Sequence, residues 1–303
     1  MPLITTNVDA LPEAFRFIVR LLIQKKEAIH KEEIKNLISP SGLVEVMSDQ
    51  KQGPSSAGQL IVERSLDQLV RAGVVEENGD HCQLTPSVSD HFAKWEDVTA
   101  ADFSEFLFRE VISRTKSKDF NEGDQANLAS AFAFLLHVPN PLEPKDFDSY
   151  ILQKQPEILG KEANDWPIVN REQCIALITW GKYFKVCTQG FTGASSFFIE
   201  PSAAFEKPIN EVLETEMPIP DFLDKLGKAV SFTDRGEIGK AAGRDWKRKS
   251  RHLSPGLALA LKVLHLQKKI ELKTNAGDAA LYRFEIEEGK DETFSHIAPG
   301  GKS

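Results

Sequence analysis

The sequence predicts a mainly helical protein with short β-hairpins, of the α+β class, in which tandem winged-helix units flank a helical middle region. Two observations support this prediction. Apolar residues recur at helical spacing along much of the chain, and several helical segments are followed by two short strand-like segments with turn residues between them. A chain of 303 residues with 41% hydrophobic content is long enough for two or three globular domains.

Residues 1–95 are expected to form the first winged-helix domain. Apolar residues at helical spacing predict two helices within residues 11–38 and a third within residues 59–72. Gly73 is expected to end the third helix, because glycine readily adopts the left-handed conformation found after helix ends. Two short strands then flank Asn78-Gly79, a sequence typical of tight hairpins.

The third helix of a winged helix often enters the DNA major groove. In this chain its exposed face is expected to carry Glu63 and Asp67 beside Arg64 and Arg71. The two signs cancel, so this helix offers phosphates little attraction. Protein contact or a structural role is therefore the preferred interpretation of the first domain.

Residues 96–217 are expected to form an acidic helical region with a second winged-helix-like unit. From residue 96 to Pro218 there are 11 Lys and Arg against 20 Asp and Glu. A helix is expected to begin after Asn170, whose side chain and that of Gln173 resemble a capping box. Strand-like segments follow on both sides of a glycine-containing turn. The net negative charge favours a protein partner over DNA.

Residues 218–286 are expected to form a basic C-terminal winged-helix domain. Its main helix is predicted to begin at Ser254, followed by Pro255 at the first helical position. Strands are expected on both sides of a turn at residues 275–278. The remaining residues, 287–303, are expected to form a disordered tail.

Charge separates this C-terminal domain from the rest of the chain. Residues 219–286 contain 14 Lys and Arg against 8 Asp and Glu, a net charge of +6, whereas the whole chain carries -8. Affinity for the phosphate backbone depends on cations that displace condensed counterions. DNA contact is therefore expected in this domain.

The candidate DNA-binding residues are a run of cations with one tryptophan, followed by two lysines of the next helix. Such cations can contact successive phosphates, and an indole offers a stacking face for an unpaired base or a sugar. The alternative is a solvated loop that aids solubility or docks an acidic protein. The predicted contacts with the DNA backbone are Arg244, Trp246, Lys247, Arg248, Lys249, Arg251, Lys262 and Lys269.

Catalytic motifs are not evident, so the chain is expected to be non-enzymatic and to need neither cofactor nor metal. It lacks a phosphate-binding loop and a nucleophile elbow. Glu271 and Lys273, with Asp245 upstream, resemble part of a metal-dependent nuclease motif. The tripeptide Glu271-Leu272-Lys273 is common by chance and lies where a wing is expected. A metal-dependent nuclease is therefore the least favoured hypothesis.

The expected compartment is the cytoplasm. The first residues show no secretion signal, and the most apolar early segment is far shorter than a membrane span. The three cysteines show no paired spacing, so reduced structural thiols are expected rather than zinc ligands. No membrane contact is expected, and the sequence assigns no oligomeric state.

Four segments carry a resemblance to a known family: residues 1–22, 63–86, 128–144 and 171–184. Together they resemble DpdG-type proteins, which are found in bacterial clusters that place 7-deazaguanine bases in DNA and restrict unmodified DNA. The resemblance implies a cytoplasmic component of a phage-defence system that works alongside helicase, ATPase and nuclease partners. It implies no catalytic residues that could be carried onto this chain.

These observations lead to one expected function and one alternative. The first is a non-enzymatic DNA-binding or adaptor subunit of a bacterial anti-phage or restriction system. It would hold the phosphate backbone through the basic C-terminal domain and other proteins through its acidic parts. The alternative is a protein-protein interaction scaffold without DNA contact.

Overall fold

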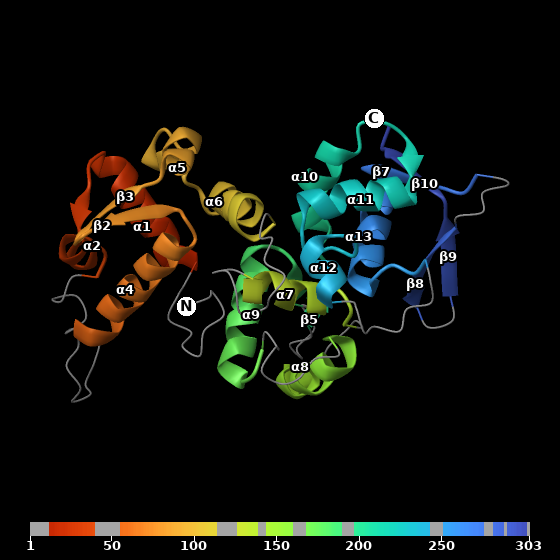
Figure 1. Cartoon of the computed structure of the whole chain (residues 1–303), viewed down its shortest axis with the longest axis horizontal. Helices are drawn as coiled ribbons and strands as arrows, with labels where there is room; N and C mark the ends of the chain where they lie inside the picture. Colours follow the sequence, from red (N-terminus) through yellow and green to blue (C-terminus); the bar gives the residue numbers. More distant parts are fainter. Residues whose placement is uncertain are drawn as a thin grey trace. The chain divides into compact units, whose positions relative to one another are not determined.

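A computed structural model describes residues 12–39, 55–113, 126–138, 144–159, 168–189, 197–242, 251–275, 281–287 and 290–301. The chain divides into two compact units, Met1–Leu107 and Phe108–Ser303. Both are rich in helices and contain small antiparallel sheets, so the predicted α+β class with mainly helical content is confirmed (Figure 1).

The described residues of the first unit form two longer helices, several shorter helices and a small sheet. Its strands form one antiparallel sheet in the order β1-β3-β2. In chain order its elements are α1 (Pro12–Lys25), β1 (Ile29–His30), α2 (Lys31–Ile38), α4 (Ser55–Arg71), β2 (Val75–Asn78), β3 (His81–Leu84), α5 (Pro86–His91), the 3-10 helix η1 (Trp95–Asp97) and α6 (Ala100–Leu107).

Two local predictions for this unit are confirmed. Gly73, two residues after the last residue of α4, adopts a φ of 69°, and the N–H of Val74 donates to the carbonyl of Leu69 at 2.9 Å, which closes the helix end. Gly79, with a φ of 60°, begins the tight turn between β2 and β3. Both glycines occupy conformations that cost other residues strain.

The strand β1 was not expected from the sequence. Ile29 pairs with Cys82 and His30 with His81, which adds a third strand to the predicted hairpin. His30 also caps α2, because its Nδ1 accepts a hydrogen bond from the N–H of Glu32 at 3.2 Å. Two residues are too few to show an alternating pattern, so periodicity could not reveal this strand.

Among the described residues, the second unit holds most of the helices and three small antiparallel sheets, β6-β10-β7, β4-β5 and β8-β9. Its elements are the π-helix η2 (Phe108–Ile112), α7 (Ala126–Leu135), α8 (Pro144–Leu159), α9 (Arg171–Tyr183), β4 (Cys187–Gln189), β5 (Phe197–Ile199), α10 (Ser202–Val212), β6 (Met217–Pro218), α11 (Ile219–Ala229), α12 (Glu237–Ala242), α13 (Pro255–Leu266), β7 (Ile270–Lys273), β8 (Tyr282–Glu287), β9 (Lys290–Phe294) and β10 (His296–Pro299).

A cluster of phenylalanine rings joins the middle region to the C-terminal region. Phe232, after α11, lies with ring centroids 5.8 Å from Phe108, 5.6 Å from Phe132 and 5.9 Å from Phe205, and Phe184 lies 5.9 Å from Phe108. Four of these rings, all except Phe108, are at most 2% exposed, and Phe108 is 4% exposed. The predicted helical region, residues 96–217, and the predicted C-terminal domain, residues 218–286, therefore share one hydrophobic core.

The start of α9 agrees with the predicted N-cap. Asn170 Oδ1 accepts from the N–H of Gln173 at 2.9 Å, as a capping residue should. The side chain of Gln173 reaches back one residue further than in a capping box, because its Oε1 accepts from the N–H of Val169 at 2.7 Å. The following strands β4 and β5 pair as a hairpin, and the glycines at 190 and 193 lie outside the described residues.

The C-terminal strand pairing differs from the prediction. β7 was expected to pair with residues 280–286, but it pairs with β10, which opposes Lys273 to His296 and Ile270 to Pro299. Residues 282–287 form β8, which pairs with β9 instead. The expected disordered tail, residues 287–303, thus contains β9 and β10, the latter the central strand of its sheet. Acidic residues made this tail resemble a solvated segment, but Ile297 is fully buried.

The same order of elements occurs twice in the chain. In the first unit α1, β1, α2, α4, β2 and β3 form a sheet in which the last strand lies between the other two. In the second unit α10, β6, α11, α13, β7 and β10 repeat this order, with α12 inserted before α13 and the β8–β9 hairpin inserted before β10. The C-terminal module therefore extends from α10 to β10, beyond the expected range of 218–286.

Candidate nucleic-acid interface

The predicted DNA-binding residues fall into two groups. Three of them, Arg251, Lys262 and Lys269, lie in described parts of the second unit. The other five lie outside the described residues, between α12 and Arg251, and they are Arg244, Trp246, Lys247, Arg248 and Lys249.

Residues 252–254, directly after the basic run of residues 244–251, are held by a loop between α11 and α12. Asp234 in that loop accepts two hydrogen bonds from Ser254, one from its N–H at 2.8 Å and one from its hydroxyl at 2.5 Å. Ser254 occupies the predicted N-cap position of α13, but its hydroxyl binds Asp234 instead of a helix N–H. These two hydrogen bonds therefore fix the C-terminal end of the basic run to the folded unit.

The other end of the basic run is anchored by the same loop. The carbonyl of Ser231 accepts hydrogen bonds from the N–H groups of Ile238 and Gly239, both at 3.0 Å, which fixes the start of α12. A Cβ added to Gly239 would lie 1.8 Å from the carbonyl oxygen of Thr233, and one added to Gly236 would lie 2.1 Å from that of Ser231. Only glycine permits this close backbone approach.

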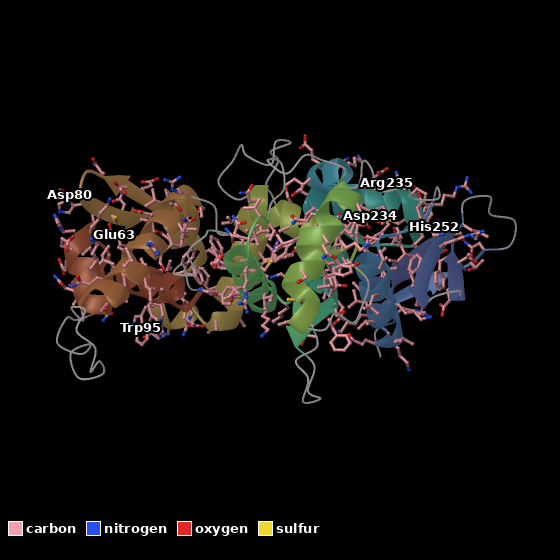
Figure 2. All side chains as sticks on the ribbon, turned by 90° about the horizontal axis from the view of Figure 1, so that it is seen from below. Glu63, Asp80, Trp95, Asp234, Arg235 and His252 are labelled. Carbon is pink, nitrogen blue, oxygen red and sulfur yellow. The ribbon has the colours of Figure 1, made fainter. Side chains whose placement is uncertain are left out.

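Arg235 connects this loop to two further elements. Its guanidinium donates to Asp224 of α11 at 3.0 Å and to the Tyr282 hydroxyl of β8 at 2.6 Å. Burial lowers the pKa of Arg235, but the interactions with Asp224 and Tyr282 outweigh it, so the pKa is raised and the charge is retained. Figure 2 labels Asp234, Arg235 and His252 in this region.

Arg251 lies beside Arg283 of β8 through backbone pairing. The N–H of Arg283 donates to the carbonyl of Arg251 at 2.9 Å, and the N–H of Leu253 donates to the carbonyl of Arg283 at 3.3 Å. Both arginines are exposed. Arg283 was not among the candidate residues predicted from the sequence, because it is far from the basic run in the sequence. Its position between Tyr282 and Phe284, in an alternating strand pattern, was the available signal.

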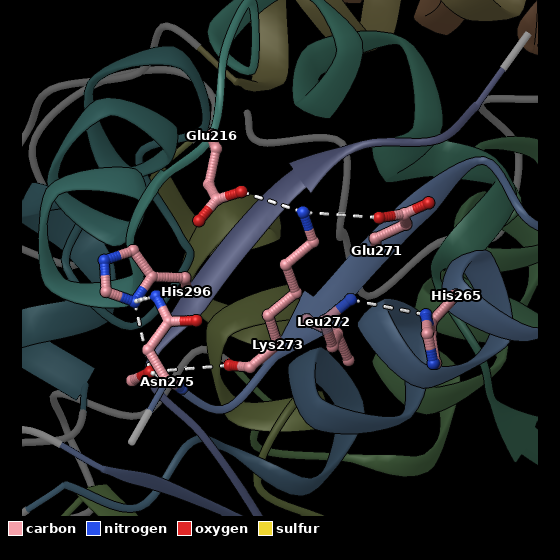
Figure 3. Close-up of polar contacts among 8 residues, drawn as sticks. Glu216, His265, Glu271, Leu272, Lys273, Asn275 and His296 are labelled. Carbon is pink, nitrogen blue, oxygen red and sulfur yellow. Dashed lines mark hydrogen bonds and ion pairs between the residues drawn. The ribbon is translucent and has the colours of Figure 1, made fainter. Parts of the chain in front are cut away.

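Lys262 and Lys269 lie beside carboxylates. Lys262 forms an ion pair with Glu292 of β9, and Lys269 Nζ lies 2.6 Å from Glu206 Oε2 of α10. Lys273 of β7 shows the same arrangement, with Nζ 2.8 Å from Glu216 Oε2 (Figure 3). Ion pairs at the surface contribute little stability, but these pairs reduce the positive potential that this part of the surface presents to phosphate.

The net charge of the C-terminal module depends on which residues are counted as part of it. Residues 202–301, from α10 to the residues just after β10, contain 16 Lys and Arg and 16 Asp and Glu, a net charge of zero. The carboxylates of Glu206, Glu216 and Glu292 all lie outside 219–286, the range with a charge of +6. The positive charge is therefore a property of the local segment around residues 244–251 and not of the folded module.

The outer face of α13 is apolar more than basic. Leu266 is 69% exposed, and Leu259 and Val263, on the same side of the helix, are half-buried. A helix with this face is poorly suited to lie along phosphates. The basic run and Arg283 are therefore better candidates for DNA contact than α13.

The first unit shows the expected mixture of charges on α4. Glu63 and Asp67 are exposed, and Lys35 of α2 lies between two carboxylates, 3.1 Å from Glu63 and 2.9 Å from Glu32. Its hydrogen bonds to these carboxylates raise the pKa of Lys35. This face offers no concentration of positive charge.

The structure describes Glu271 and Lys273 of the nuclease hypothesis. Lys273 Nζ lies 3.4 Å from Glu271 and closer to Glu216, while Asp245 lies outside the described residues. Within the described parts of the chain, no group of three or more His, Cys, Asp or Glu side chains is arranged to hold a metal ion. Every helix described is too short or too polar to cross a membrane.

Comparison with known proteins gives one result. A family model described as DpdG-like matches residues 1–279 of the chain. The matched range includes the basic run and ends before β8. No curated protein matches the chain, and no solved structure does either.

Proposed function

We propose that this chain, which belongs to the DpdG-like family, is a non-enzymatic DNA-binding or adaptor subunit of a bacterial anti-phage or restriction system. The family connects the chain to a system for 7-deazaguanine modification. Within that system the chain would hold the DNA backbone through its C-terminal module. We interpret this module and the first unit as winged helices, because both have the same helix and strand order.

The anchoring of the basic run is the observation that carries this proposal. Residues on both sides of positions 243–250 are fixed to the loop that contains Asp234. Cations held at a fixed base lose less conformational freedom when they meet phosphates than cations on an unrestrained tail. The resulting contacts are to the backbone, so they position the protein on DNA and carry no sequence preference.

Binding to short single-stranded and double-stranded DNA over a series of salt concentrations tests this function. About five phosphate contacts would give a log-log salt slope of roughly -4 to -5 on a duplex. The informative variant changes Lys247, Arg248, Lys249 and Arg251 to Glu, and it is expected to abolish binding.

A matched control removes the same amount of charge elsewhere in the second unit. Lys182, Lys185, Lys225 and Lys228 are all exposed, and their change to Glu should reduce affinity much less. Equal losses in the two variants would show a general charge effect and not a site. The proposal fails if the first variant binds normally or if the wild-type protein does not bind DNA at low salt.

A protein scaffold without DNA contact is the second candidate. The exposed Leu266 on α13 and the zero net charge of the module favour it. Large exposed apolar side chains often mark protein contacts. A test is co-purification with the helicase, ATPase and nuclease components of the system. In this case Leu266→Ser should weaken assembly, while the Glu variant of the basic run should not.

A further inference from the structure

We propose that the root of the β8–β9 hairpin forms part of the phosphate-binding surface, through Arg283 and His252 beside Arg251. This inference rests on the proposed function and names further contacts for it. It also states where the DNA backbone runs: across the root of the hairpin and not along it to the tip.

Backbone pairing determines which side chains share this surface. His252 and Arg283 are partners in a parallel bridge, so their side chains lie on the same face of the paired segments. Leu253, Tyr282 and Phe284 lie on the other face and are all buried. Arg283 therefore points away from the core, and its exposure follows from the strand alternation. Arg251, the preceding neighbour of His252, is exposed and has a φ of 74°, so the strand alternation does not extend to it.

The residues next to Arg283 hold the root of the hairpin in place. The Tyr282 hydroxyl accepts a hydrogen bond from Arg235 at 2.6 Å, and the rings of Phe284 and Phe294 lie with centroids 5.0 Å apart. Arg283 is paired through its N–H and carbonyl, which any residue at this position except proline retains. Its side chain can therefore be changed while the strand stays paired.

Charge changes sign along the hairpin. Beyond Arg283, the strands β8 and β9 carry Glu285, Glu287, Asp291 and Glu292 against Lys290 alone. Like charges repel, so a phosphate chain gains nothing by following the hairpin outward. The backbone is expected to cross the root, where Arg283 adjoins the end of the basic run.

The single variant Arg283→Glu tests this inference in the full-length protein, with a short DNA duplex as the probe. Loss of one phosphate contact should make the log-log salt slope less steep by about 0.9 and lower the affinity several-fold at low salt. Arg283→Lys should restore most of the affinity. Lys228→Glu, the matched change at another exposed site of the second unit, should leave the slope unchanged.

Two further variants test the contribution of His252 and the proposed path of the DNA backbone. His252→Ala should weaken binding less than Arg283→Glu does. Neutralising the outer hairpin with Glu285→Gln and Glu287→Gln should strengthen binding slightly, because it removes repulsion without creating a contact. A marked gain in affinity in this double variant would place the DNA backbone along the hairpin, close to these carboxylates, and would overturn the inference.

The outcomes separate this inference from the proposed function. If the Glu variant of the basic run fails to bind while Arg283→Glu binds with wild-type affinity and slope, the hairpin root is excluded and the proposed function stands. If the wild-type protein does not bind DNA at low salt, both fall. Should Arg283→Glu unfold, judged by its thermal melt, Arg283→Gln takes its place with the same expected change in slope.

Discussion

Ser254 donates two hydrogen bonds to Asp234, and this pair joins the first residue before α13 to the loop that follows α11. Ser254 is fully buried, and its N–H and hydroxyl both find their acceptor in one carboxylate. Bonds to a charged acceptor are stronger than neutral ones. The pair therefore sets the position at which the basic run meets the folded module.

Replacing Asp234 with Ala should destabilise the second unit, because it leaves two buried donors of Ser254 without their acceptor. Each unsatisfied buried group costs about 1–3 kcal/mol. Urea unfolding monitored by circular dichroism measures the change. Ser254→Ala removes only the hydroxyl bond and should cost less. Equal stability of Asp234→Ala and wild type would contradict the anchoring role of this pair.

Gly239→Ala should be strongly destabilising, because the new Cβ would lie 1.8 Å from the carbonyl oxygen of Thr233. Backbone atoms must move to relieve such a contact, and overpacking typically costs about 1–3 kcal/mol. Gly301→Ala is the control, since no atom lies within 4 Å of its added Cβ. A melting temperature of Gly239→Ala equal to that of the control would refute the close packing of this loop.

The ion pair between Glu216 and Lys273 should stabilise the protein in a pH-dependent way. The hydrogen bond from Lys273 lowers the pKa of Glu216 below its usual value of 4.5. A lowered folded-state pKa gives a stabilising contribution that is present above about pH 4.5 and is lost as the pH falls through the folded value.

The free energy of unfolding, measured between about pH 3 and pH 6 for wild type and Glu216→Gln, detects this contribution. The difference between the two proteins should shrink toward the acid end of the range. The effect should be small and should fall further in high salt, because the two side chains are 38% and 43% exposed to solvent. A difference that is constant with pH would exclude the ion pair as its source.

Cys187 should not react with thiol reagents in the folded protein. Burial raises the pKa of this thiol to about 12, so almost none of it is thiolate at pH 8. Cys82 and Cys174 are also buried. Labelling with a chromogenic disulfide reagent should therefore be slow for the native protein and reach three thiols per chain in denaturant. Rapid labelling of native Cys187 would contradict its burial.

Predictions from local sequence agree with the structure where near neighbours decide the outcome. Gly73 ends α4, Gly79 begins the first hairpin turn, and Asn170 caps α9. Each depends on a backbone conformation or a hydrogen bond within a few residues. Ser254 shows the limit of this reasoning, because it lies at the predicted cap position but binds a carboxylate from another loop.

Predictions that depended on a partner distant in the sequence agree less well with the structure. The turn-like residues 275–278 suggested that β7 pairs with the next strand-like segment, whereas β7 pairs with β10. Lys262 and Lys269 looked like extensions of the basic run, but each lies beside a carboxylate from another element. Counting charge over 219–286 missed these acids because the range did not match the folded module.

By itself, the sequence determined the helical character of the chain, the local helix ends and turns, the family and the position of the basic run. These depend on residue type and on contacts within a few positions. Only the tertiary structure decided which strands pair, that Arg283 lies beside Arg251, and that the charges of the C-terminal module cancel. Those features depend on which distant segments bury their apolar faces together, and spacing along the chain does not contain that information.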